Sequence, residues 1–310
     1  MLGSDARPGS SDASRMAVGV DLGGTRTRAA IIDEIGTVRG RIIESPTYAT
    51  GPREACFERI VETIESAVSE SGVSRQQICG IGIGTTGPLD PARGLLLDTE
   101  TLPALRNFAL GRELGERFGL AIAMTNDANA FALGEALFGA ARGERIVLGV
   151  TLGTGCGVGI VIEGRILDGA TANAGEMYRA PLEDGTFDTV LSGVGIESLF
   201  AARTGERAQA FEIASRAERG DPIAREIFAV FGERLARGLG ILAAVIDPAV
   251  IVLGGSVSRS APYFLERARL ALPEFIAPSA AERLRLEVST LGDVAGVAGA
   301  AALLVARRTG

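Results

Sequence analysis

A short run of polar residues at 125–129 is the first candidate for chemistry, because it separates the apolar segment 120–124 from the helix-forming segment 131–138. Within this run, Asp127 stands where a strand passes into the N-terminus of a helix, and the helix dipole there favours the ionised carboxylate. An ionised Asp in a cleft can accept the proton of a substrate hydroxyl as that hydroxyl attacks a phosphorus atom. From this stretch alone, a general base and a plain helix cap are equally good interpretations of Asp127.

Two glycine-rich turns, at 21–25 and 151–157, leave strand-like segments in two copies of one sequence pattern. Glycine lets backbone N–H groups come close to an anion because no Cβ intervenes. Either turn alone is explained by a tight hairpin, but the pair predicts two loops that hold the phosphates of a nucleotide from opposite sides. The carboxylate of Asp21 would repel phosphate unless a cation lay between them, so we predict Mg²⁺ bound near Asp21 through water. The residues predicted to bind phosphate in these loops are Gly23, Gly24, Thr25, Gly153, Thr154 and Gly155.

The residue types that are missing exclude whole classes of mechanism. The chain has 310 residues, its 31 basic residues are all Arg, and it contains no His and no Trp. Without His there is no Ser-His-Asp nucleophile and no His-ligated zinc, and without Lys there is no Schiff base and no P-loop lysine. A formal net charge of -7 argues against nucleic acid as the main partner. A carboxylate is therefore the expected agent of acid–base chemistry near neutral pH.

A β-rich phrase at 17–33, consisting of strand, glycine turn and strand, recurs at 146–162 and predicts a duplicated two-domain architecture. Helices are predicted over 52–69 and after the cap Asp221, and a strand is predicted over 249–253. Hairpins followed by alternating helices and strands indicate an α/β protein with mixed sheets. The predicted organisation is a disordered leader at 1–15, an N-terminal α/β domain at 16–130, a C-terminal α/β domain at 131–296, and a C-terminal helix at 297–310 as a candidate addition to the first domain.

The segment 82–87 matches the glycine fingerprint of dinucleotide-binding proteins and follows a strand-like run. That fingerprint requires a helix to begin at the turn, and Pro88 and Pro91 disfavour a continuous helix there. We therefore interpret the segment as a loop at the end of a strand that lines a cleft, and not as a site for NAD.

Cysteine usage and hydropathy place the chain in the cytoplasm. Cys56, Cys79 and Cys156 are odd in number and widely spaced, which is typical of reduced thiols and not of a disulfide framework. The most apolar stretch, 240–255, is interrupted by Asp247 and is too short to span a membrane. The polar start of the chain lacks the apolar core of a signal peptide. We expect no membrane partner.

With these motifs in order, the sequence resembles the ROK family of sugar kinases and repressors, within the actin-like, hexokinase-like ATPase superfamily. The resemblance implies a two-domain actin-like (ribonuclease H-like) ATPase fold with a central cleft, ATP and Mg²⁺ as donor, a hexose-like acceptor and a homodimer. Repressor members carry a winged-helix segment before the first hairpin, and the short polar stretch 1–15 predicts no DNA binding. The matching phrases are 21–25, 84–91, 126–129, 152–155, 175–176, 253–255 and 292–301.

The resemblance also implies roles for single residues. Asp127 matches the family's catalytic base, and Asn126 and Glu176 match its ligands for sugar hydroxyls. The two glycine turns match its phosphate loops, and Gly254 with Gly255 matches its turn on the adenosine side. The remaining residue assigned to the substrate from a matching phrase is Gly87, in the loop that lines the cleft.

Two departures from the family pattern alter the expected acceptor pocket. Arg179 stands where many members have a His that binds the sugar or a zinc ion, and Asp188 stands where sugar kinases usually have a Glu. We therefore expect Glu176, Arg179 and Asp188 to bind the substrate in a changed pocket. The alternative for Arg179 is a solvated surface residue or an ion pair with Glu183 or Asp184.

Two further departures concern metal and phosphate. The family's cysteine-rich zinc motif is missing, because the segment 181–193 contains no Cys, so we predict no zinc. Arg26 replaces the usual Lys after the first turn, which keeps the charge and changes its geometry. Arg26 is counted with the phosphate-binding residues.

The sequence thus predicts an ATP-dependent kinase for a hydroxyl of a hexose-like sugar, with glucose as the default acceptor. An amino sugar or a cyclitol is an alternative acceptor, because the pocket residues differ from the family pattern. A hypothesis of another class is a sugar-sensing protein that keeps the fold without catalysis. The hydroxyl that is phosphorylated and the preferred phosphoryl donor are left open.

Overall fold

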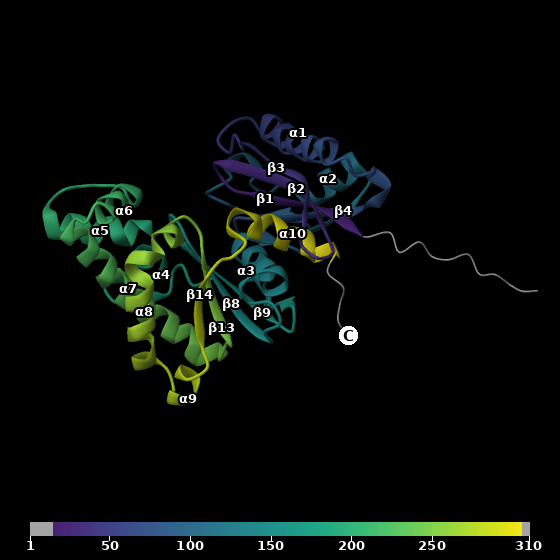
Figure 1. Ribbon diagram of the computed structural model, residues 1–310. Helices are drawn as coiled ribbons and strands as arrows, with labels where there is room; N and C mark the ends of the chain where they lie inside the picture. Colours follow the sequence, from purple (N-terminus) through teal and green to yellow (C-terminus); the bar gives the residue numbers. More distant parts are fainter. Residues whose placement is uncertain (1–14, 306–310) are drawn as a thin grey trace, which may run out of the picture.

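The computed structural model describes residues 15–305, which form two five-stranded sheets with helices on both faces (Figure 1). The predicted α/β class with mixed sheets is confirmed, because each sheet combines an antiparallel hairpin with parallel strands. The leader predicted at 1–15 lies outside the described residues except for Arg15, and residues 306–310 of the predicted C-terminal helix also lie outside them.

The first sheet has the strand order β3-β2-β1-β4-β7. Strand β1 pairs antiparallel with β2 and parallel with β4, and β4 pairs parallel with β7. The carboxyl ends of β1, β4 and β7 therefore meet at one edge, where loops can assemble a site. The bounds are β1 Met16–Leu22, β2 Arg26–Asp33, β3 Val38–Pro46, β4 Ile78–Thr85 and β7 Ala121–Asn126.

The second sheet repeats this plan with the order β10-β9-β8-β13-β14. Strand β8 pairs antiparallel with β9 and parallel with β13, and β13 pairs parallel with β14. The recurrence predicted from the two glycine phrases is thus a recurrence of the hairpin itself. The bounds are β8 Ile146–Leu152, β9 Cys156–Ile162, β10 Arg165–Ile166, β13 Val250–Gly254 and β14 Arg285–Val288.

Alternation along β1 decides which of its side chains reach the centre of the molecule. Val18 and Val20 belong to the core under helix α1 (Arg53–Ser71), whereas Ala17 belongs to the core under α10 (Ala295–Val305). Because successive side chains point to opposite faces of a sheet, Asp21 also falls on the α10 side.

Helices α3 (Asp127–Phe138) and α10 lie between the two sheets (Figure 1). Their backbones come so close that a Cβ built on Gly299 would lie 1.7 Å from the carbonyl oxygen of Ala130. A Cβ on Gly134 would likewise lie 2.3 Å from the carbonyl oxygen of Ala295. Glycine at both positions is what permits this crossing of the two helices. Helix α10 also packs against β1 and β4 of the first sheet, so the crossing joins the two halves.

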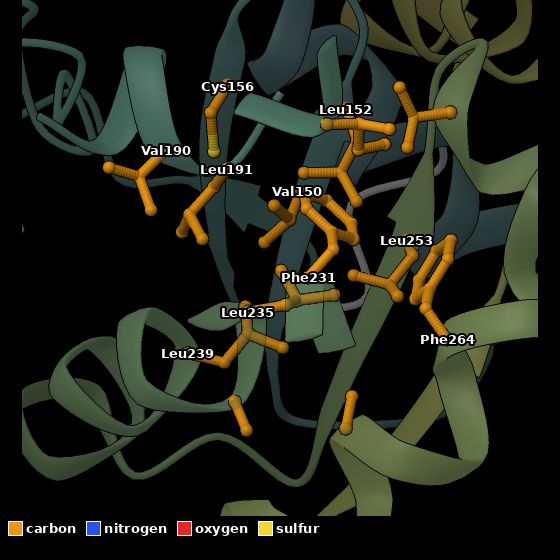
Figure 2. Close-up of a cluster of buried hydrophobic side chains, with 14 of the residues drawn as sticks. Val150, Leu152, Cys156, Val190, Leu191, Phe231, Leu235, Leu239, Leu253 and Phe264 are labelled. Carbon is orange, nitrogen blue, oxygen red and sulfur yellow. The ribbon is translucent and has the colours of Figure 1, made fainter. Parts of the chain in front are cut away.

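The outer face of the second sheet carries a large apolar core (Figure 2). Val150 and Leu253 of the sheet pack against Phe231 of α7 (Pro222–Ile246) and Phe264 of α8 (Ala261–Ala271). Helix α7 begins where the sequence predicts, because Asp221 caps it by accepting the backbone N–H groups of Ile223 and Ala224 at 2.8 and 3.2 Å.

The other predicted elements also agree with the structure. Helix α1 at 53–71 matches the predicted 52–69 with Pro52 as its N-cap, β13 at 250–254 matches the predicted 249–253 shifted by one residue, and no helix begins at the turn after β4. None of the helices within 15–305 is both long and apolar enough to cross a membrane. The remaining bounds are β5 Leu89–Asp90, β6 Leu95–Leu96, β11 Pro181–Leu182, β12 Gly185–Thr186, α2 Leu110–Phe118, α4 Phe187–Val190, α5 Gly193–Thr204, α6 Ala210–Glu218, α9 Pro278–Ala281, and the 3-10 turns η1 Arg75–Gln77, η2 Pro103–Leu105, η3 Val257–Ser260, η4 Leu272–Phe275 and η5 Gly292–Val294.

Candidate active site

The junction of β7 and α3 assigns separate positions to its two polar residues. Asn126 occupies the N-cap position and accepts the backbone N–H of Ala128 at 2.8 Å through its side chain. Asp127 is the first residue of the helix, and its Oδ1 accepts the same N–H at 2.8 Å. Because the cap position belongs to Asn126, the helix needs no cap from Asp127, and the carboxylate is free for another use.

The acidity of Asp127 differs from the sequence prediction. The helix dipole predicts a readily ionised carboxylate, but protein surrounds Asp127 on most sides although the residue reaches solvent. Loss of hydration raises the pKa of this carboxyl and outweighs the backbone N–H groups of Ala128 and Asp127, which lower it. The backbone at the helix end lowers the pKa in the direction that the sequence predicts, and burial outweighs it. A raised pKa brings the group closer to the range in which a general base works.

Three segments far apart in the chain meet beside Asp127. The side chain of Asn126 donates from Nδ2 to Oε1 of Glu176 at 3.1 Å. A Cβ built on Gly87 would lie 3.6 Å from that Nδ2 and 4.0 Å from that Oε1, so a side chain there would fill the same space. Burial raises the pKa of Glu176, and the charge of Asp127 raises it further. The structure thus brings Gly87, Asn126, Asp127 and Glu176 together.

Strand register and one glycine explain this meeting. Thr85 of β4 pairs with Asn126 of β7, so the loop that carries Gly87 leaves the sheet beside the start of α3. Gly175 has a φ of 86°, and a Cβ there would lie 2.3 Å from the carbonyl oxygen of Val158. Only glycine suits that position, and the turn places Gly175 against β9, with Glu176 next to it in the chain.

The first glycine turn contributes a second carboxylate to the cleft. Asp21 lies opposite Arg28 in the hairpin, with 4.0 Å between Oδ2 and the guanidinium Nη1. Burial raises the pKa of Asp21 to about 6, the charge of Asp127 adds to this rise, and Arg28 opposes it. A Cβ on Gly296 would lie 3.4 Å from Cγ of Asp21, so the start of α10 closes this side of the carboxylate.

The other predicted residues of the first turn lie around this carboxylate. Gly23 donates its N–H to the carbonyl of Arg26 at 3.0 Å, and a Cβ on Gly24 would lie 2.6 Å from a methyl group of Thr101. Thr25 is exposed at the tip of the turn. Arg26 ion-pairs with Glu44 at 3.1 Å and leaves 62% of its side chain exposed. The turn therefore offers backbone groups and one exposed guanidinium to the solvent.

The sequence did not predict a network of ion pairs that connects the two halves of the protein. Arg28 reaches Glu44 at 2.7 Å and Asp293 at 3.7 Å, and Asp293 contacts Arg259 of η3 at 3.1 Å. The hairpin register, which sets Arg28 opposite Asp21, is the signal that could have identified Arg28. Asp293 and Arg259 are brought in only by the fold.

The second glycine turn holds Asp188 closely. Cys156 donates its backbone N–H to Oδ1 of Asp188 at 2.7 Å, and a Cβ on Gly155 would lie 2.3 Å from the same oxygen. Gly153 is fixed by two backbone hydrogen bonds, to Gly155 at 2.9 Å and from Gly193 at 2.8 Å. Asp188, which the sequence places with the substrate, therefore touches the turn predicted to hold phosphate.

A pocket of about 600 Å³ opens beside this second turn. Its apolar surface includes Phe211, which is 72% exposed, and Val194, which is 41% exposed. Gly255 has a φ of 80°, and a Cβ there would lie 2.4 Å from the carbonyl oxygen of Leu152, so this turn also requires glycine. A Cβ on its neighbour Gly254 would strike the ring of Phe131. The lining also includes Thr154, Ser256, Tyr263 and Arg259.

Arg179 is exposed, and within residues 15–305 it forms no ion pair and no hydrogen bond. The alternative of a pair between Arg179 and Glu183 is wrong, because Glu183 pairs with Arg234 and Arg237 at 3.1 and 3.6 Å. The backbone on either side of Arg179 contacts the start of α4, where Asp188 donates its N–H to the carbonyl of Tyr178 at 3.4 Å.

The donor groups suit magnesium better than zinc. Within the described chain, no group of three or more His, Cys, Asp or Glu side chains is arranged to hold a metal ion. The segment 181–193 offers no thiol and the sequence no imidazole, so these residues do not fit zinc. The charge of Asp127 acts on Asp21 of the first turn, and carboxylate oxygens of this kind are donors that Mg²⁺ binds, partly through water.

Comparison with known proteins gives the same family over nearly the whole chain. The model of the ROK family matches residues 17–307. An N-acetyl-D-glucosamine kinase of Photobacterium profundum is 32% identical, and the match covers 93% of this chain and 99% of that protein.

Solved structures share the fold at similar identity. A ROK hexokinase from Thermus thermophilus matches with a TM-score of 0.80 and 32% identity, over 94% of this chain and 97% of that one. A ROK family glucokinase from Streptomyces griseus, solved in complex with glucose and AMPPNP, matches with a TM-score of 0.78 and 27% identity, over 93% of this chain and 99% of that one.

Proposed function

The chain belongs to the ROK family, and from this premise we propose that it transfers the terminal phosphoryl group of ATP to a hydroxyl of a hexose-like sugar, with Asp127 as general base. Relatives that match nearly its full length are sugar kinases, and the chain is a sugar kinase as well. The observation that carries the finer proposal is the meeting of Gly87, Asn126 and Glu176 around Asp127.

The acceptor would bind among these residues. Asn126 and Glu176 offer an amide and a carboxylate 3.1 Å apart, which suits neighbouring hydroxyls of a sugar. Gly87 keeps the space in front of them free of a side chain. Asp127, whose charge already acts on Glu176, is then in reach of the hydroxyl that reacts.

The reaction would proceed by in-line transfer. Asp127 accepts the hydroxyl proton, the sugar oxygen forms a bond to the γ-phosphorus, and the bond from that phosphorus to the bridging oxygen breaks to release ADP. Mg²⁺ held near Asp21 would offset the negative charge of the phosphates. Backbone N–H groups of both glycine turns would donate to the phosphates, apart from those of Gly23 and Gly153, which bond within their own turns. Arg26, which pairs with Glu44 and is largely exposed, would add a positive charge at the first turn.

The donor would place its nucleoside in the pocket beside the second turn. The volume of about 600 Å³ suits a nucleoside, and the exposed ring of Phe211 offers a surface for stacking. The glucokinase of Streptomyces griseus, whose structure holds AMPPNP, supports ATP as the donor.

The relatives support two acceptors above others. Glucose is supported by the glucokinase of Streptomyces griseus, and an amino sugar is supported by the N-acetyl-D-glucosamine kinase of Photobacterium profundum. A cyclitol stays a prediction from the altered pocket around Arg179. The homodimer and the cytoplasmic location also stay predictions.

The test is ADP release with Mg-ATP and a panel of glucose, N-acetylglucosamine, other amino sugars and a cyclitol. Asp127→Asn should lower kcat by about 10²–10⁴-fold and keep sugar binding measured by calorimetry. Glu282→Gln, which changes an exposed carboxylate at the end of α9, is the control and should leave turnover unchanged. Because the pKa of Asp127 is raised, kcat/KM of the unchanged protein should fall with decreasing pH already above the ordinary pKa of aspartate, about 3.9.

Two results would contradict the proposal. Full turnover in Asp127→Asn would remove this residue as the base. Saturable sugar binding without ADP release on any acceptor would refute the kinase and favour the sugar-sensing alternative.

A further inference from the structure

The segment 173–188 carries three of the residues expected around the acceptor, namely Glu176, Arg179 and Asp188. Near its start, Gly175 lies against β9, and at its end Asp188 lies against the second glycine turn. Half of the segment between these points is exposed, and it contains no long helix or strand. Something must hold it in place if Glu176 is to meet Asn126.

Its central hairpin, formed by β11 and β12, is anchored at the tip by Glu183. This residue adopts a left-handed backbone with a φ of 54°, which is uncommon for a residue other than glycine. Its Oε2 lies 3.1 Å from Nε of Arg234, and its Oε1 lies 3.6 Å from Nε of Arg237. Both arginines come from α7, so one carboxylate joins the tip of the hairpin to that helix. We name these three residues the Glu183 clamp.

The pair of Glu183 and Arg234 is shielded more than an ordinary surface ion pair. The side chains of Glu183 and Arg234 are only 20% and 25% exposed, whereas that of Arg237 is 53% exposed. Arg237 also lies over the ring of Phe275, with 5.5 Å from its Cζ to the ring centre, which limits its motion. Partly buried pairs are screened less by solvent and salt than exposed ones, so this contact can hold a segment in place.

Apolar packing supports the base of the same hairpin. A Cβ on Gly238 of α7 would lie 3.4 Å from Leu182 and 3.5 Å from Phe187. Both side chains therefore pack against α7 at a position where the helix carries no side chain. Both are buried. Apolar packing alone tolerates small rotations of the hairpin, whereas the clamp at the tip fixes its angle on the helix.

We propose that Glu183 is a positioning residue for the acceptor: its clamp onto Arg234 and Arg237 holds the segment 173–188 so that Glu176 meets Asn126, whereas Asp188 is held at the second turn by the N–H of Cys156. This inference rests on the proposed sugar kinase function. It assigns the clamp to the affinity for the sugar and separates it from the nucleotide pocket, whose lining includes no residue of the segment.

The decisive variant is Glu183→Gln, which removes the charge and nearly keeps the shape. We expect the KM for the acceptor to rise by about tenfold, because small displacements of a binding group are costly. The KM for ATP and kcat should stay within about twofold. Glu233→Gln is the matched control, since Glu233 also lies on α7 and lines the same pocket as the clamp, but ion-pairs with Arg267 of α8 and not with the segment. It should leave both KM values unchanged.

Hydrogen–deuterium exchange of the segment 173–188 gives a readout that needs no turnover. Exchange should be faster in Glu183→Gln than in the unchanged protein and in Glu233→Gln, by about tenfold. If Glu183→Gln does not fold, Arg234→Gln is used in its place, because it removes the same ion pair by changing the arginine. In a double-mutant cycle, Glu183→Gln combined with Arg234→Gln should cost little more than either change alone.

An acceptor KM and an exchange rate that are both unchanged in Glu183→Gln would overturn the clamp. An equal rise in the KM for sugar and for ATP would also overturn it, because it would indicate a general loss of structure. Failure of the unchanged protein to phosphorylate any sugar would refute the proposed function instead. In that case, faster exchange in Glu183→Gln would still support the clamp, and unchanged exchange would overturn it.

Discussion

The two hairpins of this protein have the same strand pairing, but equivalent positions carry charged residues in the first and uncharged residues in the second. In the first, Asp21 lies opposite Arg28 and is surrounded by Glu44 and Asp293. In the second, the residue equivalent to Asp21 is Thr151, which lies opposite Gly157 with no charge on either. A repeated backbone thus supplies two similar turns, and side-chain charge makes one suited to cations and phosphate.

The residues around the two turns differ in the same way: charged groups surround the first turn, and a pocket with apolar side chains lies beside the second. Beside the first turn, burial raises the pKa of Asp21, and neighbouring carboxylates raise it further. Beside the second lies the pocket with the apolar surface of Phe211 and Val194. The comparison teaches that the fold sets where two loops face each other, whereas the residues around each loop decide which end of a nucleotide it suits.

The largest expected effect comes from making the first hairpin like the second. Asp21→Thr should lower kcat by about 10²-fold or more, because the carboxylate that holds the cation is lost. Steady-state kinetics with Mg-ATP measures this loss. Thr151→Ser, which keeps the hydroxyl of the second hairpin, is the control and should stay near the unchanged rate. A kcat for Asp21→Thr close to that of the unchanged protein would show that the charge at the first turn is not needed for turnover, and the contrast between the two turns would have no functional meaning.

An intermediate effect is expected where the two halves join. Gly299→Ala should destabilise the protein by about 3 kcal/mol, because its Cβ would strike the backbone of α3. Chemical denaturation gives the free energy of unfolding. Gly115→Ala is a matched change within helix α2, where a Cβ makes only an ordinary contact at 3.6 Å, and it should stabilise by about 0.5–1 kcal/mol. Equal effects of the two variants would mean that the close crossing of α3 and α10 does not limit stability.

The smallest expected effect is a change in the KM for ATP, and it tests whether the pocket beside the second turn binds the nucleoside. Phe211→Ala should raise the KM for ATP by about fivefold, because a stacking surface is lost, and should leave the KM for the sugar unchanged. Val245→Ala removes another exposed apolar side chain, 78% exposed on α7 and outside the pocket, and should change neither KM. A change in the KM for sugar alone would place the nucleoside elsewhere.

Features set by nearby residues were predicted well. The hairpins at 17–33 and 146–162, and the helix that begins after Asp221, follow from alternation, glycine turns and caps, which act over a few residues. The place of Asp127 between a strand and a helix follows in the same way. The direction of its pKa shift could not be predicted in this way, because the pKa reflects hydration by the whole cleft and not the helix end alone.

The sequence by itself determined the chemistry that is possible: without Lys and His, carboxylates and Arg must carry the site, and the order of glycine phrases identified the family. Only the tertiary structure decided which charges meet. Arg28 reaches Asp293 across more than half the chain, and Glu183 pairs with α7 instead of its neighbour Arg179. The physical reason is range: backbone preferences act between neighbours in sequence, whereas Coulomb interactions and desolvation act between whatever groups the packed fold brings within a few ångströms.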